Sequence, residues 1–231
     1  MAYLLHLETS TKQCSVALAY KGELLASRVL LNETFSHSEK LHLFSSEVLE
    51  EANLKASELD AIAVSKGPGS YTGLRIGVGA AKGFCFGLDI PLIALNALEI
   101  LVQSSKAQDA DYFIPMMDAR RMEVYTAVFD KNKQWVQETS ALVLGQDSFK
   151  SLLKEKTALV LGDGAAKFKA LNPERNAIFS TETHYPSAVD MISMAWEKFN
   201  RKAFESLAYF EPFYLKDFQT TPPKKIKGSS H

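Results

Sequence analysis

Residues 3–20 read YLLHLETSTKQCSVALAY, a strand-like run that ends at the acidic Glu8 and is followed by a second strand-like run. Residues 112–129 read YFIPMMDARRMEVYTAVF and repeat this arrangement about 110 positions later, with Asp118 in the place of Glu8. Apolar runs bounded by short polar turns are typical of buried strands. A pattern repeated at this spacing indicates that the chain consists of two related halves.

The elements predicted around these two stretches define the fold class. Strands are expected at 3–8, 14–20, 23–31, 60–65 and 91–95, with helices at 38–53 and 72–88. The second half repeats this order, with strands at 112–117, 122–129, 134–144 and 157–162 and helices at 146–154, after Gly162, and at 187–204. The order βββαβαβ predicts an α/β protein made of two ribonuclease-H-like halves. We expect an N-terminal domain at 1–106, a C-terminal domain at 107–215, and an extended tail at 216–231 whose last four residues resemble an expression-tag remnant.

Composition and charge exclude several classes of protein. The 231 residues are 46% hydrophobic, and 26 basic side chains nearly cancel 27 acidic ones. This excludes a largely disordered chain and a strongly basic wrapper of nucleic acid. Cys14 and Cys85 form no CxxC pair, and no signal peptide or membrane-spanning run is evident. We therefore expect a soluble cytoplasmic protein.

The run KGPGSYTGLR at residues 66–75 lies where a predicted strand passes into a predicted helix. Backbone N–H groups and the helix dipole at such a place can hold an anion, whereas glycines there also allow strand and helix to pack closely. Close packing is the favoured interpretation because the run matches neither a Walker motif nor G-x-G-x-x-G.

Short polar loops at two strand ends form a candidate vestigial nucleotide site. They resemble the loops that actin-like ATPases place near phosphate, metal and adenosine, and their residues are Glu8, Thr9, Ser10, Thr11, Asp118, Gly162, Asp163 and Gly164. Short polar residues also simply terminate strands. No catalytic or metal-binding constellation is expected, since His37 and His42 point to different sides of a helix and no HExxH or GxSxG motif occurs.

The predicted helix at 72–88 carries only Arg75 and Lys82 as charged residues. A helix that covers one face of a sheet normally keeps a broad polar side, so this helix should be covered from a second side as well. Either another part of the same chain or a partner chain could supply that cover. For a partner, the expected interface residues on this helix and on 38–53 are Leu41, Phe44, Ser45, Val48, Gly73, Gly77, Ala80, Ala81 and Phe84.

Taken together, these stretches closely resemble the TsaB (YeaZ) family of tRNA threonylcarbamoyladenosine biosynthesis subunits. The matching segments, in order, are Glu8–Thr11 with Ser15–Leu18, His37–Glu39, Gly67–Gly77, Asp118–Ala119–Arg120 with Glu123–Tyr125, Gly162–Ala165 and Glu211–Leu215. The resemblance covers nearly the whole chain, and the Gly67–Gly77 run is its most specific part.

The resemblance implies an actin-like ATPase fold and a role beside TsaD, the related subunit that transfers a threonylcarbamoyl group to N6 of adenosine 37 in tRNAs reading ANN codons. TsaD carries two metal-binding histidines where this chain has Ala97 and Leu101. Neither residue can ligate a metal, so the chain is expected not to catalyse the transfer. The family often has Asp at the position of Glu8, which puts magnesium binding in doubt.

The expected function is that of a non-catalytic scaffolding and activating subunit of the modification complex. Expected partners are TsaD, the ATPase TsaE, tRNA through the complex, and a second copy when the chain is alone. No obligatory cofactor is expected, and ATP or ADP binding would be weak or dependent on a partner. An M22-like peptidase and a small-molecule kinase of the same fold are the competing hypotheses.

Overall fold

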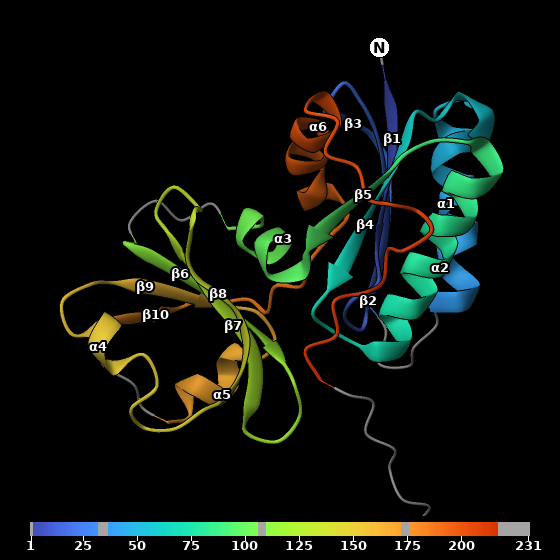
Figure 1. Ribbon diagram of the computed structural model, residues 1–231. Helices are drawn as coiled ribbons and strands as arrows, with labels where there is room; N and C mark the ends of the chain where they lie inside the picture. Colours follow the sequence, from blue (N-terminus) through green and yellow to red (C-terminus); the bar gives the residue numbers. More distant parts are fainter. Residues whose placement is uncertain (1, 32–36, 106–109, 172–175, 217–231) are drawn as a thin grey trace, which may run out of the picture.

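The computed structural model describes residues 2–31, 37–105, 110–171 and 176–216. Their strands form two five-stranded sheets, one in each half of the chain (Figure 1). The strand order is β3-β2-β1-β4-β5 in the first sheet and β8-β7-β6-β9-β10 in the second. Each strand of the first sheet thus has a counterpart at the same position in the second. This confirms the predicted α/β fold of two ribonuclease-H-like halves.

Strand directions are also the same in both sheets. Three antiparallel strands are followed by two that run parallel to the first strand. The first sheet consists of β1 (Tyr3–Glu8), β2 (Gln13–Tyr20), β3 (Glu23–Leu31), β4 (Ala61–Gly67) and β5 (Leu92–Asn96). The second consists of β6 (Tyr112–Asp118), β7 (Glu123–Asp130), β8 (Trp135–Val143), β9 (Ala158–Leu161) and β10 (Ala177–Phe179).

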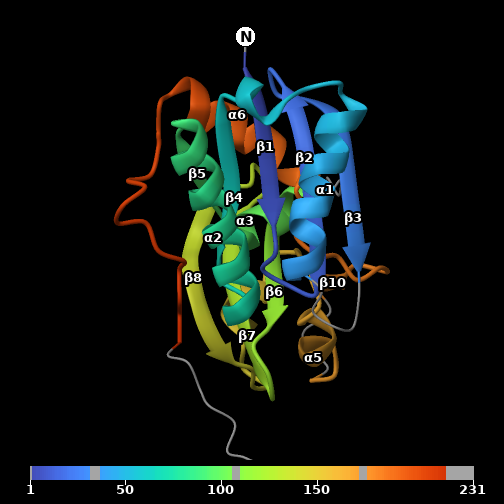
Figure 2. The same cartoon turned by 90° about the vertical axis from the view of Figure 1, so that its right-hand side faces the viewer.

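Helices cover both faces of the first sheet. Helices α1 (His37–Glu51) and α2 (Tyr71–Leu88) lie side by side on one face, as Figure 2 shows. Alternate residues of β1 divide between the two sides: Leu5 and Leu7 pack toward α1 and α2, and Leu4 packs toward α3 (Ala97–Gln103) and α6 (Ile192–Asn200). The remaining short helices are η1 (Ala56–Glu58), α4 (Lys150–Leu153), α5 (Ala165–Lys169) and η2 (Val189–Met191). In the described part of the chain, no helix combines the length and the apolar character needed to cross a membrane.

The chain returns to the first sheet after completing the second. Ile192 and Ala195 of α6 are buried against Leu4 and Ala17 of the first sheet. Residues 187–204, which the sequence places in the C-terminal domain, therefore complete the core of the N-terminal half. The predicted domain boundary between residues 106 and 107 stays a prediction.

Most predicted elements are confirmed to within one or two residues. The helix predicted at 146–154 is only α4, and the helix predicted at 187–204 is split into η2 and α6. Three elements were not predicted: the short helix η1, helix α3, which directly follows β5, and the three-residue strand β10. Residues 212–216 form no regular element, as expected, but they are packed on the protein, whereas residues 217–231 lie outside the described residues.

Candidate functional site

The glycine-rich run packs tightly against the polar loop that follows β1. A Cβ atom at Gly69 or Gly73 would overlap the carbonyl oxygen of Ser10 or Thr9. The Ser70 N–H donates to the Ser10 carbonyl at 2.7 Å, and the Thr9 hydroxyl donates to the Gly73 carbonyl at 2.8 Å. The two segments use these polar groups on each other, so the geometry favours the close-packing interpretation over an anion site.

Glu8 lies fully buried at the end of β1. Its Oε1 accepts a hydrogen bond from the Ser10 N–H at 2.6 Å, and its Oε2 has no hydrogen-bond partner among the described residues. The buried hydroxyls of Ser10 and Ser65 also lack partners there. Burial raises the pKa of Glu8, against the opposing effect of the hydrogen bond from the Ser10 N–H. An acid enclosed in this way cannot reach a magnesium ion that is exposed to solvent.

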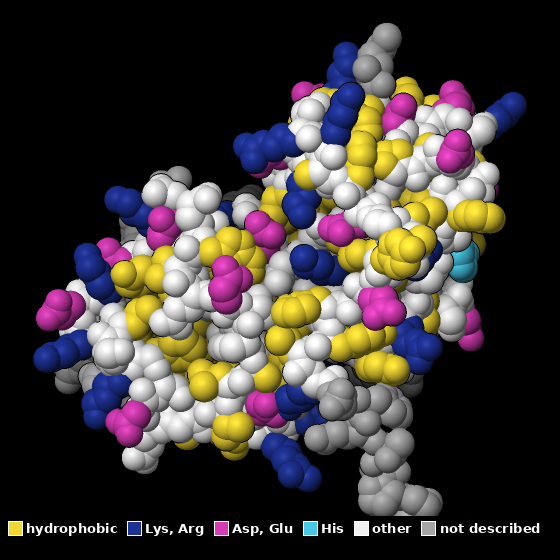
Figure 3. Space-filling model, in the orientation of Figure 1, with side chains coloured by type: hydrophobic (Ala, Val, Ile, Leu, Met, Phe, Trp, Pro, Cys, Tyr) yellow, Lys and Arg dark blue, Asp and Glu magenta, His cyan; other side chains and the backbone are white. Residues whose placement is uncertain are grey.

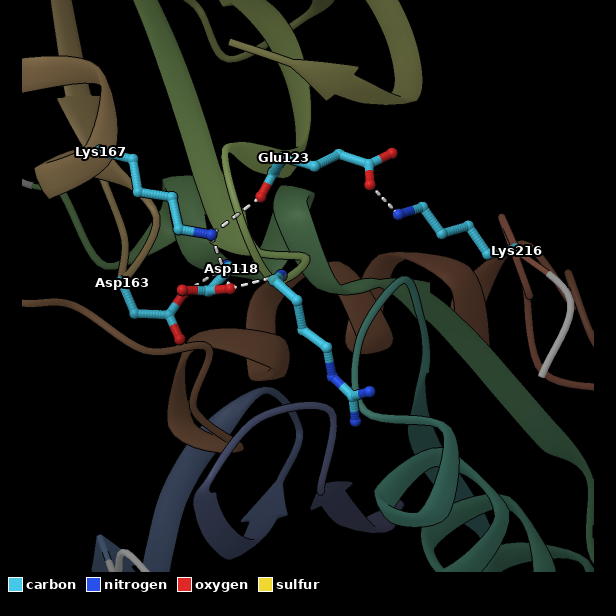
Figure 4. A network of polar contacts seen from close by, with 6 residues as sticks. Asp118, Glu123, Asp163, Lys167 and Lys216 are labelled. Atoms are coloured by element: carbon cyan, nitrogen blue, oxygen red, sulfur yellow. Dashed lines mark hydrogen bonds and ion pairs between the residues drawn. The ribbon is translucent and has the colours of Figure 1, made fainter. Parts of the chain in front are cut away.

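In the second half, Asp118 and Asp163 lie together in a polar network (Figure 4). The Asp118 carboxylate pairs with Lys167 at 2.8 Å and accepts the Arg120 N–H at 2.6 Å. The backbone N–H of Asp118 donates to the Asp163 carboxylate at 2.9 Å. Burial raises the pKa of Asp163, and the charge of Lys12 from the first half opposes that shift.

The turn at Gly162–Gly164 follows β9 and holds Asp163 close to β6. The Gly164 N–H donates to the Met116 carbonyl at 2.9 Å. Gly162 has a φ of 106°, and a Cβ atom there would overlap the same carbonyl. The backbone of this turn therefore needs glycine for packing.

The structure thus brings the predicted loop residues to facing strand ends of the two halves, but their chemistry does not fit a magnesium–nucleotide site. Glu8 is enclosed, and Asp118 is already neutralised by Lys167. In the described ranges, no three His, Cys, Asp or Glu side chains are grouped to hold a metal ion. We derive no chemical step through a nucleotide in this chain.

Most of the residues predicted for a partner interface are buried inside the chain, which corrects that prediction. Leu41, Ser45, Val48, Gly73, Gly77, Ala80 and Ala81 are all buried, and only Phe44 and Phe84 are partly exposed. Gly73 and Gly77 face Thr9, because the loop after β1 lies under the first half of α2. The residues predicted on α2 therefore lie on the side of this helix that faces the protein interior.

The outward ridge of α2 consists of Gly79, Gly83 and Gly87, and a Cβ atom added at any of the three would meet nothing within 4 Å. Phe86 beside them is 83% exposed, and Leu43 of α1 is also exposed. We call these five residues the α1–α2 face. The other flank of α2 is covered by the same chain, since Lys82 donates to the Phe210 carbonyl at 3.0 Å. One side of this helix is thus covered by the same chain, and a different side is open to a partner.

Ala97 and Leu101 lie on α3 and are fully buried in an apolar cluster with Phe113 and Phe129. The Asn96 side chain caps this helix by accepting the Leu98 N–H at 2.9 Å. These positions are therefore part of the packing between the two halves. Sequence reasoning also missed the contacts of residues 205–216, because no motif marks where an irregular segment will lie.

Comparison with known proteins gives consistent matches over the whole chain. A family model described as TsaD, tRNA N6-adenosine threonylcarbamoyltransferase, matches residues 33–224. The tRNA threonylcarbamoyladenosine biosynthesis protein TsaB of Haemophilus influenzae is 32% identical over 97% of both chains. That of Escherichia coli is 28% identical over 97% of this chain and 98% of its own length. The solved structure of YeaZ from Pseudomonas aeruginosa is 28% identical, with a TM-score of 0.77 over 93% of this chain and all of the other.

Proposed function

Because this chain belongs to the TsaB family of tRNA threonylcarbamoyladenosine biosynthesis proteins, we propose that it is a non-catalytic subunit that binds and activates TsaD. The α1–α2 face is the observation that carries this proposal. It combines an open ridge of three glycines with the exposed ring of Phe86. A helix of a partner can approach closely along such a ridge, and the ring would leave water on contact.

The chemistry of the candidate site supports a non-catalytic role. Ala97 and Leu101 carry no metal-binding atoms and are buried in the core. Glu8 is enclosed, and Asp118 is paired with Lys167. These four residues therefore offer no free group to activate a carbonyl or a phosphate, which supports the proposal that the transfer itself depends on TsaD.

Further partners belong to the same proposal. The α1–α2 face would hold a second copy when the chain is alone, and it would exchange that copy for TsaD in the working complex. TsaE and tRNA would meet the chain within the complex, and nucleotide binding would be weak or need a partner. We propose the cytoplasm as its location, and its two unpaired buried cysteines agree with a reducing compartment.

A reconstituted modification assay tests the function. The purified chain, TsaD, or both would be incubated with threonylcarbamoyl-adenylate and unmodified tRNA, and modified adenosine would be measured. We expect no product from the chain alone, and more product from the mixture than from TsaD alone. Product from the chain without TsaD would show that it is itself a catalyst. Equal activity of TsaD with and without the chain would refute activation.

The peptidase and kinase hypotheses have separate tests. Hydrolysis of an unstructured peptide by the purified chain would support the peptidase, and tight MgATP binding by the isolated chain would support the kinase. We expect neither, because Glu8 is buried and the Asp118 carboxylate is paired with Lys167.

A further inference from the structure

Basic side chains lie next to aromatic rings where the two halves of the chain face each other. The Lys12 ammonium, in the loop after β1, lies 5.5 Å from the centre of the Tyr185 ring. The Arg75 guanidinium of α2 lies 5.4 Å from the centre of the Tyr71 ring and donates to the Tyr71 hydroxyl at 3.1 Å. The attraction between a cation and a ring face holds both partners in place. Two such pairs therefore lie on the first half at this junction.

The β6–β7 hairpin of the second half adds the same combination. Lys216 forms an ion pair with Glu123 of β7, and its ammonium lies 5.9 Å from the centre of the Tyr125 ring. Burial raises the pKa of Tyr125, and the charges of Lys216 and Arg120 oppose that shift. Figure 4 shows Lys216 reaching Glu123 from a separate segment of the chain. Two cations thus lie near one ring on this side of the junction as well.

Contacts across the junction join these groups into one surface. Tyr214 lies two residues before Lys216, and its ring packs on that of Tyr71 with centroids 4.9 Å apart. Burial raises the pKa of Asp163 in the second half, and the charge of Lys12 opposes this shift, so Lys12 also faces the second half. Figure 3 shows basic side chains on both halves around the junction, with apolar and acidic ones among them. We define the junction face by six of these residues: Lys12, Arg75, Arg120, Arg121, Tyr125 and Tyr214.

The acidic side chains beside the junction face are mostly paired. Asp118 forms an ion pair with Lys167, and Glu123 forms one with Lys216. Asp163 takes part in no ion pair within the described ranges, and its carboxylate accepts the Asp118 N–H. One acid is therefore left to oppose the remaining basic side chains.

Three arginines of the junction face have no acidic partner. Arg75, Arg120 and Arg121 are exposed, and no ion pair in the part of the chain that the structure describes includes any of them. Arg120 and Arg121 also have φ values of 70° and 48°, a left-handed backbone that favours glycine or asparagine. A strained turn that keeps two arginines indicates a role for their side chains. The face thus presents a surplus of positive charge to solvent.

We propose that the junction face binds an unpaired stretch of the tRNA on which the complex acts. This inference rests on the proposed function and assigns a surface to it. Guanidinium groups bind phosphate oxygens through paired hydrogen bonds, and tyrosine rings stack on unpaired bases. The Tyr214 side chain is 39% exposed and can take part in such stacking. A duplex or an acidic protein segment would use the arginines alone, whereas single-stranded RNA uses the arginines and the rings together.

Fluorescence anisotropy with labelled, unmodified tRNA and the reconstituted complex of this chain with TsaD tests the arginines. The double change Arg120→Gln with Arg121→Gln should weaken binding about tenfold at about 0.1 M salt, and should reduce the slope of log K against log salt by about 1–2. The matched control is Arg201→Gln with Lys202→Gln, an adjacent exposed basic pair that follows α6. Lys202 also has a positive φ, of 55°. The control should bind as the native complex does.

A second arm tests the rings with a labelled single strand of about 12 nucleotides and a duplex of the same length. Tyr214→Leu in the same complex should weaken binding of the single strand about fivefold and leave the duplex unaffected. Tyr209→Leu is the control, because its side chain is 87% exposed and belongs to no contact of the junction face. An equal effect of Tyr214→Leu on both probes would overturn the stacking part of the proposal.

Further readouts separate this proposal from the proposed function. Circular dichroism would establish that each variant is folded, and titration calorimetry would measure its binding to TsaD. Native tRNA affinity in the double arginine variant, or an equal loss in its control, would overturn the junction face even if the native chain activates TsaD. Weaker binding of the arginine variant to TsaD would make the face a protein contact and also overturn the proposal. Failure of the native chain to activate TsaD would instead refute the proposed function.

Discussion

Glu8 is the residue whose environment departs most from its ordinary chemistry. It is fully buried, its Oε2 has no hydrogen-bond partner in the described part of the chain, and no ion pair there includes it. Burial raises its pKa above the ordinary value of 4.5, so the folded chain keeps the proton where the unfolded chain has lost it. Its contribution to the free energy of unfolding is therefore present below about pH 4.5 and is lost as pH rises through the folded pKa.

We predict that Glu8→Gln is at least as stable as the native chain at pH 7. The amide keeps an oxygen for the Ser10 N–H and adds a donor near the hydroxyls of Ser10 and Ser65, without a charge to bury. Urea unfolding at several pH values from 5 to 8 should show an advantage of the variant that grows as pH rises. Glu50→Gln, at an exposed position, serves as the control. A constant loss of stability in Glu8→Gln at every pH would contradict this account.

Substitution of alanine for two different glycines of α2 should change the free energy of unfolding in opposite directions. A Cβ atom at Gly73 overlaps the Thr9 carbonyl, which belongs to backbone and cannot rotate away, whereas a Cβ atom at Gly83 meets open space. We predict that Gly73→Ala lowers the free energy of unfolding by about 2–4 kcal/mol. Gly83→Ala should raise it by about 0.5–1 kcal/mol through helix propensity. Urea unfolding measures both changes. If both variants changed the free energy of unfolding in the same direction, the inward and outward sides of α2 would be assigned wrongly.

At the scale of elements, the outer side of α2 carries the proposed contact with TsaD. Phe86 is 83% exposed, so a charge there costs the isolated chain little, whereas a partner would have to bury it. We predict that Phe86→Asp weakens binding to TsaD at least tenfold, which corresponds to about 1.4 kcal/mol, and leaves thermal unfolding unchanged. Pull-down and titration calorimetry would measure the binding.

Val143→Asp is the matched control for that change. It places the same charge at an exposed apolar position of β8, in the other half of the protein. This variant should bind TsaD as the native chain does. Normal binding by folded Phe86→Asp would remove the α1–α2 face from the interface.

The sequence predicted where the helices and strands lie better than it predicted which side of each is buried. The low charge of α2 correctly indicated cover from two sides, but Gly73 and Gly77 were assigned outward because nothing in the pattern places Thr9 beneath them. Helix α3 was missed because its seven residues are nearly all buried and show no polar side. The paired strand-end acids were found from the repeat itself. The pairing of Asp118 with Lys167 and the enclosure of Glu8 follow from tertiary contacts, which a single sequence does not display.

At the scale of the whole molecule, the first half cannot complete its core from its own segment. Leu4, Ala17 and Ala19 are covered by Ile192 and Ala195, which come after the second sheet in the chain. We predict that a fragment of residues 1–105 binds a hydrophobic dye such as ANS and unfolds without cooperativity, since this apolar side is left bare. A chain ending at Lys216 should unfold cooperatively like the full chain. A cooperative, dye-free fragment would show that α6 is dispensable.

The position of α6 also determines the order in which the protein can be finished during synthesis. Strands β1 to β5 leave the ribosome first, but the helix that closes their second face emerges only after the entire second sheet has been made. Roughly 95 residues separate the end of β5 from the start of α6. At a synthesis rate of about 5–20 residues per second, the nascent first sheet stays open for about 5–20 seconds. During that interval the uncovered apolar side of the first sheet is a natural binding site for a chaperone that recognises exposed apolar strands.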